Sequence, residues 1–205
     1  MGNKETGKTT FIYKLQKKDY LPEQTNEMKV EKAKIKLSSS KQCSILSKER
    51  YRSYKLVITD VPGKFSHRRV WRTAIKKNRS KDTTAIVLFI DPTQNPQDTK
   101  SATEDVFNHY MEALNTKSPE KADQKAKEQQ LLLIIVVNKT ELLDTDEQAE
   151  TFVREDLKET LKTFREHIPK IAIEIYPVSV KYWKYSTYIN PIFERLKRFF
   201  YDDRM

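Results

Sequence analysis

The chain has 205 residues, a formal net charge of +10, three glycines and a single cysteine. This length can bury a core in one domain, and 37% hydrophobic residues exclude an intrinsically disordered chain. One cysteine excludes an internal disulfide and indicates a reducing compartment. No apolar run reaches the roughly 18 residues of a membrane span. The positive charge favours an acidic partner, or it reflects only a lysine-rich solvated surface.

The apolar pattern alternates strands and helices along the whole chain. In chain order, it predicts a helix from Phe11, strands at 33–37 and 55–60, a helix over 70–75, a fully buried strand at 84–91, a helix over 102–114, a second buried strand at 131–137, a long helix over 152–168, a strand at 171–175 and a last helix over 192–200. Such alternation predicts an α/β fold with a mostly parallel sheet. We expect one domain over 1–205, with residues 117–130 as an exposed charged insertion.

Two of the three glycines open a phosphate-binding loop. Residues 2–9 fit the pattern G-x-x-x-x-G-K-[ST], and a helical pattern follows directly. Backbone N–H groups of such a loop bind phosphate oxygens, the lysine reaches the β- and γ-phosphates, and the last hydroxyl binds Mg²⁺. The predicted nucleotide-binding residues are Gly2, Asn3, Lys4, Glu5, Thr6, Gly7, Lys8, Thr9 and Thr10, with Thr9 also a metal ligand.

The strand that normally leads into a phosphate loop is missing, because only Met1 precedes Gly2. We expect a truncated first strand rather than an incomplete sheet, since the loop needs an anchored N-terminal side. Residues 1–6 also fit the M-G-x-x-x-[ST] pattern of N-myristoylation. That alternative competes for Gly2, which could hardly be acylated and still begin a phosphate cradle.

Three more motifs follow, each at the end of a predicted strand. Asp60-Val61-Pro62-Gly63 offers a carboxylate for Mg²⁺ and the Gly63 N–H for a γ-phosphate. Asn138-Lys139-Thr140-Glu141 resembles the guanine-reading motif N-K-x-D, with Glu141 one methylene longer than aspartate. Ser179-Val180-Lys181 resembles the S-A-K motif that meets the guanine O6. We therefore predict base binding by Asn138, Lys139, Glu141, Ser179, Val180 and Lys181.

Four such motifs in this order resemble the small GTPases of the Ras/Arf-like superfamily. Residues 58–69 and 85–91 are most similar to the family of signal recognition particle receptor beta subunits. The resemblance implies a P-loop NTPase three-layer sandwich that binds GTP or GDP with Mg²⁺. It also implies a first-switch threonine on the metal, for which Thr25 is the candidate by position, beside Asp60.

The resemblance further implies a GTP-dependent switch in protein transport, at the cytosolic face of the endoplasmic reticulum. Lys64 stands where the family positions its attacking water with Gln or His, and an ammonium only donates. We therefore expect slow or partner-dependent hydrolysis and name no certain catalytic residue.

The segment 64–81 carries eight basic residues and no acid. Together with Thr25, this segment is a candidate docking face for a protein partner such as the receptor alpha subunit, for a ribosome or for an anionic membrane. We expect no DNA partner. The alternative is a solvated helix face. A catalytically inactive scaffold and a basic ribosome- or RNA-contacting module remain alternatives.

Overall fold

A computed structural model of the chain describes residues 1–2, 6–8, 10–11, 32–38, 53–59, 69–78, 83–114, 119–143, 145–179, 191–192, 194–196 and 198–202. Its centre is a parallel sheet with the strand order β3-β4-β5. These strands span Thr83–Ile90, Gln130–Val137 and Ile171–Pro177. Seven of the eight residues of β4 are buried, as the continuous apolar run predicts for a strand covered on both faces.

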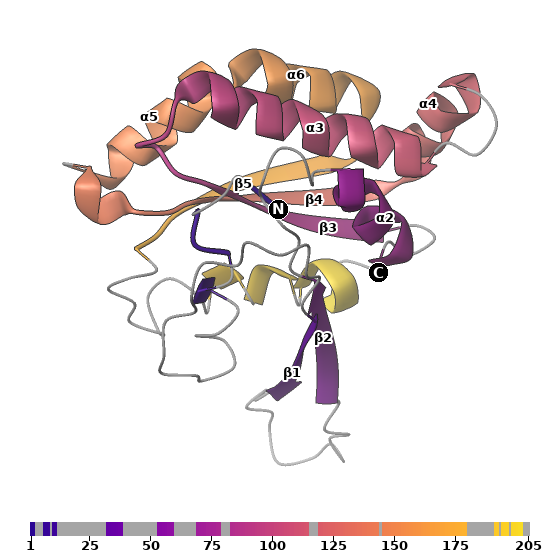
Figure 1. Ribbon diagram of the computed structural model, residues 1–205. Coiled ribbons are helices and arrows are strands. Elements are labelled where there is room, and N and C mark those ends of the chain that lie inside the picture. Colours follow the sequence, from indigo (N-terminus) through magenta and orange to yellow (C-terminus); the bar gives the residue numbers. More distant parts are fainter. Residues whose placement is uncertain are drawn as a thin grey trace.

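A second sheet is an antiparallel pair of strands, β1 (Lys32–Ser38) and β2 (Ser53–Thr59). Figure 1 shows this pair extending away from the parallel sheet. Both strands lie where the sequence predicts them.

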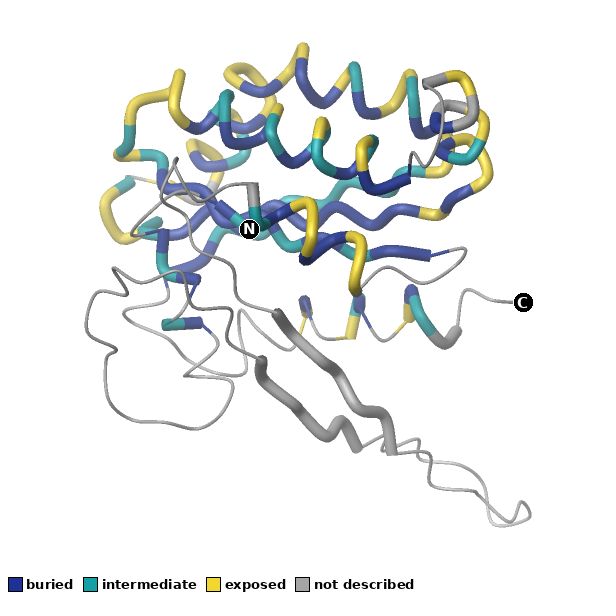
Figure 2. Tube along the Cα trace, turned by 45° about the vertical axis from the view of Figure 1, so that its right-hand side comes forward, coloured by how far each residue is buried: buried dark blue, intermediate teal, exposed yellow. Residues whose placement is uncertain are grey.

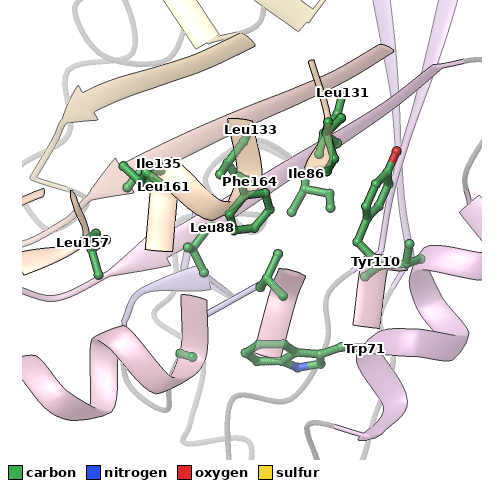
Figure 3. Close-up of a cluster of buried hydrophobic side chains, with 14 of the residues drawn as sticks. Trp71, Ile86, Leu88, Tyr110, Leu131, Leu133, Ile135, Leu157, Leu161 and Phe164 are labelled. Carbon is green, nitrogen blue, oxygen red and sulfur yellow. The ribbon is translucent and has the colours of Figure 1, made fainter. Parts of the chain in front are cut away.

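Helices cover one face of the parallel sheet. They are α2 (Arg69–Asn78), α3 (Pro96–Leu114), α4 (Pro119–Glu128), α5 (Asp146–Asp156) and α6 (Lys158–His167). The larger core lies beneath them, where Trp71, Tyr110 and Phe164 pack with the odd-numbered residues of β4 (Figure 3). Trp71 and the other two aromatic side chains are fully buried, so α2 and α3 are fixed to the sheet by apolar packing.

The opposite face of the sheet packs against the two ends of the chain. Leu132, Ile134 and Val136 form a second core with Phe11 and with the C-terminal helical residues Ile192, Leu196 and Phe199. Phe199 lies in the last of these C-terminal helical turns, η3 (Arg198–Asp202), which is π-helical. Figure 2 shows the buried strands between these turns and the helices on the other face. Side chains of a strand alternate between its two faces, so β4 contributes to both cores. The sheet with a layer on each face confirms the predicted α/β sandwich.

The predicted long helix over 152–168 is two helices. Leu157 leaves helical geometry at φ −104 and ψ 4 and separates α5 from α6. Leu157 is nevertheless fully buried, together with Val153 and Leu161 on either side. Its neighbours therefore keep helical spacing across the break, which is why periodicity alone indicates one helix.

Most of the stretch 117–130 forms the helix α4. Ala122 and Ala126 of this helix are buried, whereas Glu120 and Lys127 are exposed. Ala126 thus belongs to the larger core, while Glu120 and Lys127 face solvent. Within the part of the chain that the structure describes, no helix is both long and apolar enough to cross a membrane.

Candidate functional site

The beginning of the chain lies against the edge of β3. The Phe89 N–H donates to the Met1 carbonyl at 2.8 Å, and the Met1 ammonium donates to the Val87 carbonyl. Gly2 forms a parallel bridge with Phe89. The phosphate loop therefore starts from a sheet position next to β3, as expected for a loop that leaves a parallel strand.

Both glycines of the loop have backbones that favour glycine. Gly2 has φ 126 and Gly7 has φ 87. A Cβ at Gly2 would also lie 2.0 Å from the Phe89 carbonyl oxygen, closer than any real contact allows. Close approach and positive φ together explain why a chain with three glycines has two of them here.

The ammonium of Lys8 is held inside the loop. Lys8 is 8% exposed, and its Nζ donates to the Gly2 carbonyl at 2.9 Å and to the Thr6 hydroxyl at 3.2 Å. A helical turn begins at the same place, where the Phe11 N–H donates to the Gly7 carbonyl at 2.9 Å. A buried cation needs such partners, so the loop presents one positive charge at the N-terminus of a helix.

Asn138 ties the predicted base loop to the phosphate loop. It follows β4 directly, and its side-chain amide donates to the Thr6 carbonyl at 3.1 Å. Its own N–H donates to the Ile90 carbonyl at 2.9 Å. The two predicted motifs are thus in direct contact, although they are far apart in the sequence.

Lys139 has a left-handed backbone, at φ 63 and ψ 34, and its ammonium forms an ion pair with Asp91 Oδ2 at 2.5 Å. Asp91 directly follows β3 and is 1% exposed. Its other oxygen, Oδ1, accepts from the Thr93 N–H at 3.0 Å and from the Thr93 hydroxyl at 2.6 Å. The sequence motifs do not identify Asp91 as a site residue. The available signal was an acid at the end of a buried strand, the same signal that identified Asp60.

Glu141 lies in the short 3₁₀ helix η2 (Thr140–Leu142) and is exposed. The Thr140 N–H donates to the Val178 carbonyl at 3.3 Å, which connects the base loop to the end of β5. Ser179 follows there and is 8% exposed. The base loop therefore contacts three parts of the protein: the phosphate loop, the end of β3 and the end of β5.

Several predicted site residues lie outside the described residues. The structure brings together Gly2, Thr6, Lys8 and Asn138, and it places Lys139, Glu141 and Ser179 at the same edge of the sheet. The predicted residues that it does not describe are Asn3, Lys4, Glu5, Thr9, Thr25, Asp60, Gly63, Lys64, Val180 and Lys181. Their roles in ligand binding stay predictions.

The helix α2 carries the described part of the basic segment 64–81. Arg72, Lys76 and Lys77 are exposed, while Trp71 and Ile75 on the other face are buried. Arg72 lies 3.6 Å from Glu112 of α3, and both side chains are about half exposed, at 53% and 50%. Such a solvated pair contributes little stability, so these charges remain accessible to a partner.

No family model and no curated protein sequence is similar to the chain. Solved structures are similar in fold. The chain of the signal recognition particle receptor SRb-GTP/SRX complex from Chaetomium thermophilum aligns at 14% identity with a TM-score of 0.55, over 90% of each chain. The GDP-bound Roco2 RocCORdC of Methanosarcina barkeri aligns at 14% identity with a TM-score of 0.51. That match covers 97% of this chain but only 46% of the Roco2 chain.

These likenesses confirm the fold predicted from the motifs. The chain has the α/β fold of P-loop GTPases, and its architecture is similar to that of the aligned chain of the SRb-GTP/SRX complex. At this level of identity the likeness concerns the fold, and function depends on the residues of the site.

Proposed function

We propose that the chain is a guanine-nucleotide-binding switch with GTP and GDP as its ligands. The observation that supports this most strongly is the contact between the two predicted motifs, in which Asn138 donates to the carbonyl of Thr6. The same loop holds the Lys8 ammonium and has a positive φ at both Gly2 and Gly7, a backbone that suits a phosphate cradle. A cation and a helix N-terminus suit a polyphosphate, and the attached loop is in position to contact a base.

In this proposal Mg²⁺ accompanies the nucleotide. The Thr9 and Thr25 hydroxyls and the Asp60 carboxylate are the proposed ligands, and oxygen donors of this kind fit Mg²⁺. The ion would neutralise phosphate charge when bound. Loss of the γ-phosphate would release Thr25 and the segment 63–72, which is how a nucleotide switch changes its surface.

Competition between GTP, ATP and XTP tests the guanine assignment. Carboxylate recognition of the guanine N1 and N2 groups leaves adenine unpaired, so we expect GTP to bind at least about 100-fold more tightly than ATP. Glu141 is the proposed acceptor. Equal affinity for ATP and GTP would refute the guanine assignment, and absence of binding to any of the three would refute a nucleotide switch.

Slow or partner-dependent hydrolysis is the second element of the proposal. Lys64 can only donate hydrogen bonds and cannot accept a proton from an attacking water. Single-turnover hydrolysis separates this slow enzyme from the alternative of an inactive scaffold. Lys64 and Glu141 favour that alternative, because both depart from the family pattern. A rate equal to that of free GTP, with a docked partner present, would establish the scaffold.

We also propose a role in protein targeting at the cytosolic face of the endoplasmic reticulum, supported by the fold likeness to SRb. SRb was solved in complex with SRX, so a protein partner on the switch segments is the corresponding proposal here. The exposed Arg72, Lys76 and Lys77 suit an acidic surface. Binding of purified ribosomes that depends on salt but not on nucleotide would instead favour a basic ribosome-contacting module.

A further inference from the structure

The carboxylate of Asp91 is buried at the point where β3 ends, and its partners hold it in one position. Oδ1 accepts two hydrogen bonds from Thr93, at 3.0 Å from the N–H and 2.6 Å from the hydroxyl. Oδ2 lies 2.5 Å from the Lys139 ammonium. Asp91 is 1% exposed, and a buried carboxylate is stable only with partners of this kind. The nucleotide-binding motifs give it no role.

The side chain of Lys139 is held at both ends. Its backbone is left-handed, and among the described residues no other non-glycine has a positive φ. The Leu142 N–H donates to the Lys139 carbonyl at 2.9 Å and stabilises that backbone. At the far end Asp91 binds the ammonium, although the side chain is 32% exposed and could extend into water. The four-carbon stem is therefore fixed between two anchors.

We infer that Asp91 is a positioning residue for the purine base. By binding the Lys139 ammonium, it sets the stem of that lysine in place before a nucleotide arrives. This inference rests on the proposed function, because the stem covers a base only if the chain binds a nucleotide. A stem that is already ordered loses less rotamer freedom on binding, which is equivalent to roughly 2- to 10-fold in affinity.

The ion pair between Asp91 and Lys139 gives the charges of Lys8 and Lys139 different roles. Lys8 is bonded to the Gly2 carbonyl and the Thr6 hydroxyl within the phosphate loop. The charge of Lys139 is instead neutralised by Asp91, so it adds little attraction for phosphates. Removal of the Asp91 charge should therefore weaken binding of the base without weakening binding of a polyphosphate.

Calorimetric titration of the full chain with GDP and with inorganic tripolyphosphate tests this inference. In Asp91→Asn the amide oxygen can still accept from Thr93, but the negative charge is lost. We expect GDP to bind roughly 2- to 10-fold more weakly to this variant, with tripolyphosphate binding unchanged or slightly tighter. Asp156→Asn makes the same charge change at an exposed site at the end of α5, and we expect both affinities to match the wild type.

Each other result contradicts the inference in its own way. Equal losses for GDP and tripolyphosphate in Asp91→Asn would mean that Asp91 only supports the fold. Wild-type affinity for both ligands would mean that the lysine stem needs no anchor. A wild-type chain that does not bind GDP would overturn the proposed function, and this inference with it, whereas the first two results leave the proposed function standing.

Discussion

Replacing Asn138 by alanine tests how strongly the base loop supports the phosphate loop. The Asn138 side-chain amide donates to the Thr6 carbonyl at 3.1 Å, and the two residues are only 4% and 1% exposed. The substitution takes a donor from a carbonyl that water reaches poorly, which costs about 1–3 kcal/mol of folding free energy. A chain of this size changes its Tm by roughly 2–4 °C per kcal/mol. We therefore expect the Tm to fall by about 2–12 °C.

Thermal unfolding followed by circular dichroism measures this loss. Asn138→Asp should lower the Tm further than Asn138→Ala, because it sets a carboxylate against a carbonyl oxygen. Asn108→Ala is the matched control, since Asn108 is exposed on α3. Its free energy of unfolding should stay within about 0.5 kcal/mol of the wild type. The reasoning is refuted if the Asn138→Ala and Asn108→Ala variants unfold at the same temperature.

Three further predictions concern the loop, the core and the last strand. Gly7→Ala adds a Cβ to a backbone at φ 87. We expect its free energy of unfolding in urea to fall by about 1–2 kcal/mol, and its calorimetric affinity for GDP to fall at least about tenfold. Wild-type values for both would contradict the left-handed backbone at Gly7. Leu133→Ala leaves a cavity at a fully buried position. Its free energy of unfolding in urea should fall by about 2–5 kcal/mol, and a loss under 1 kcal/mol would contradict this prediction. Burial and then the hydrogen bond to Glu174 raise the pKa of Tyr176 to about 12. The unfolded chain therefore loses this proton first, near pH 10, and stability should fall between about pH 10 and 12; Tyr176→Phe should lessen that fall, as urea unfolding across this range would show.

Local patterns in the sequence predicted the parts of the fold that depend on neighbouring residues. The run in β4 predicted a strand buried on both faces, because each face alone is apolar. Gly2 and Gly7 predicted the phosphate loop, because glycine is rare in this chain and the loop backbone requires it.

Features that depend on distant contacts could not be predicted in the same way. The break at Leu157 leaves the helical spacing of its neighbours intact, so periodicity does not detect it. Asp91 and Lys139 pair only because two parallel strands end side by side. The sequence shows an acid after one strand and a lysine after the next, but it does not show which charges will meet.

The contacts of Met1 and Thr6 also determine when the phosphate loop can fold during synthesis at the ribosome. Met1 is anchored by Val87 and Phe89, and Thr6 is bound by Asn138, which is 132 residues further along the chain. Contacts between residues so far apart form late, because the intervening chain must first be made and closed into a loop. The phosphate loop is therefore among the last parts of the fold to be completed. Until residue 138 has emerged, a nascent chain lacks the clamp on its phosphate loop and should not retain nucleotide.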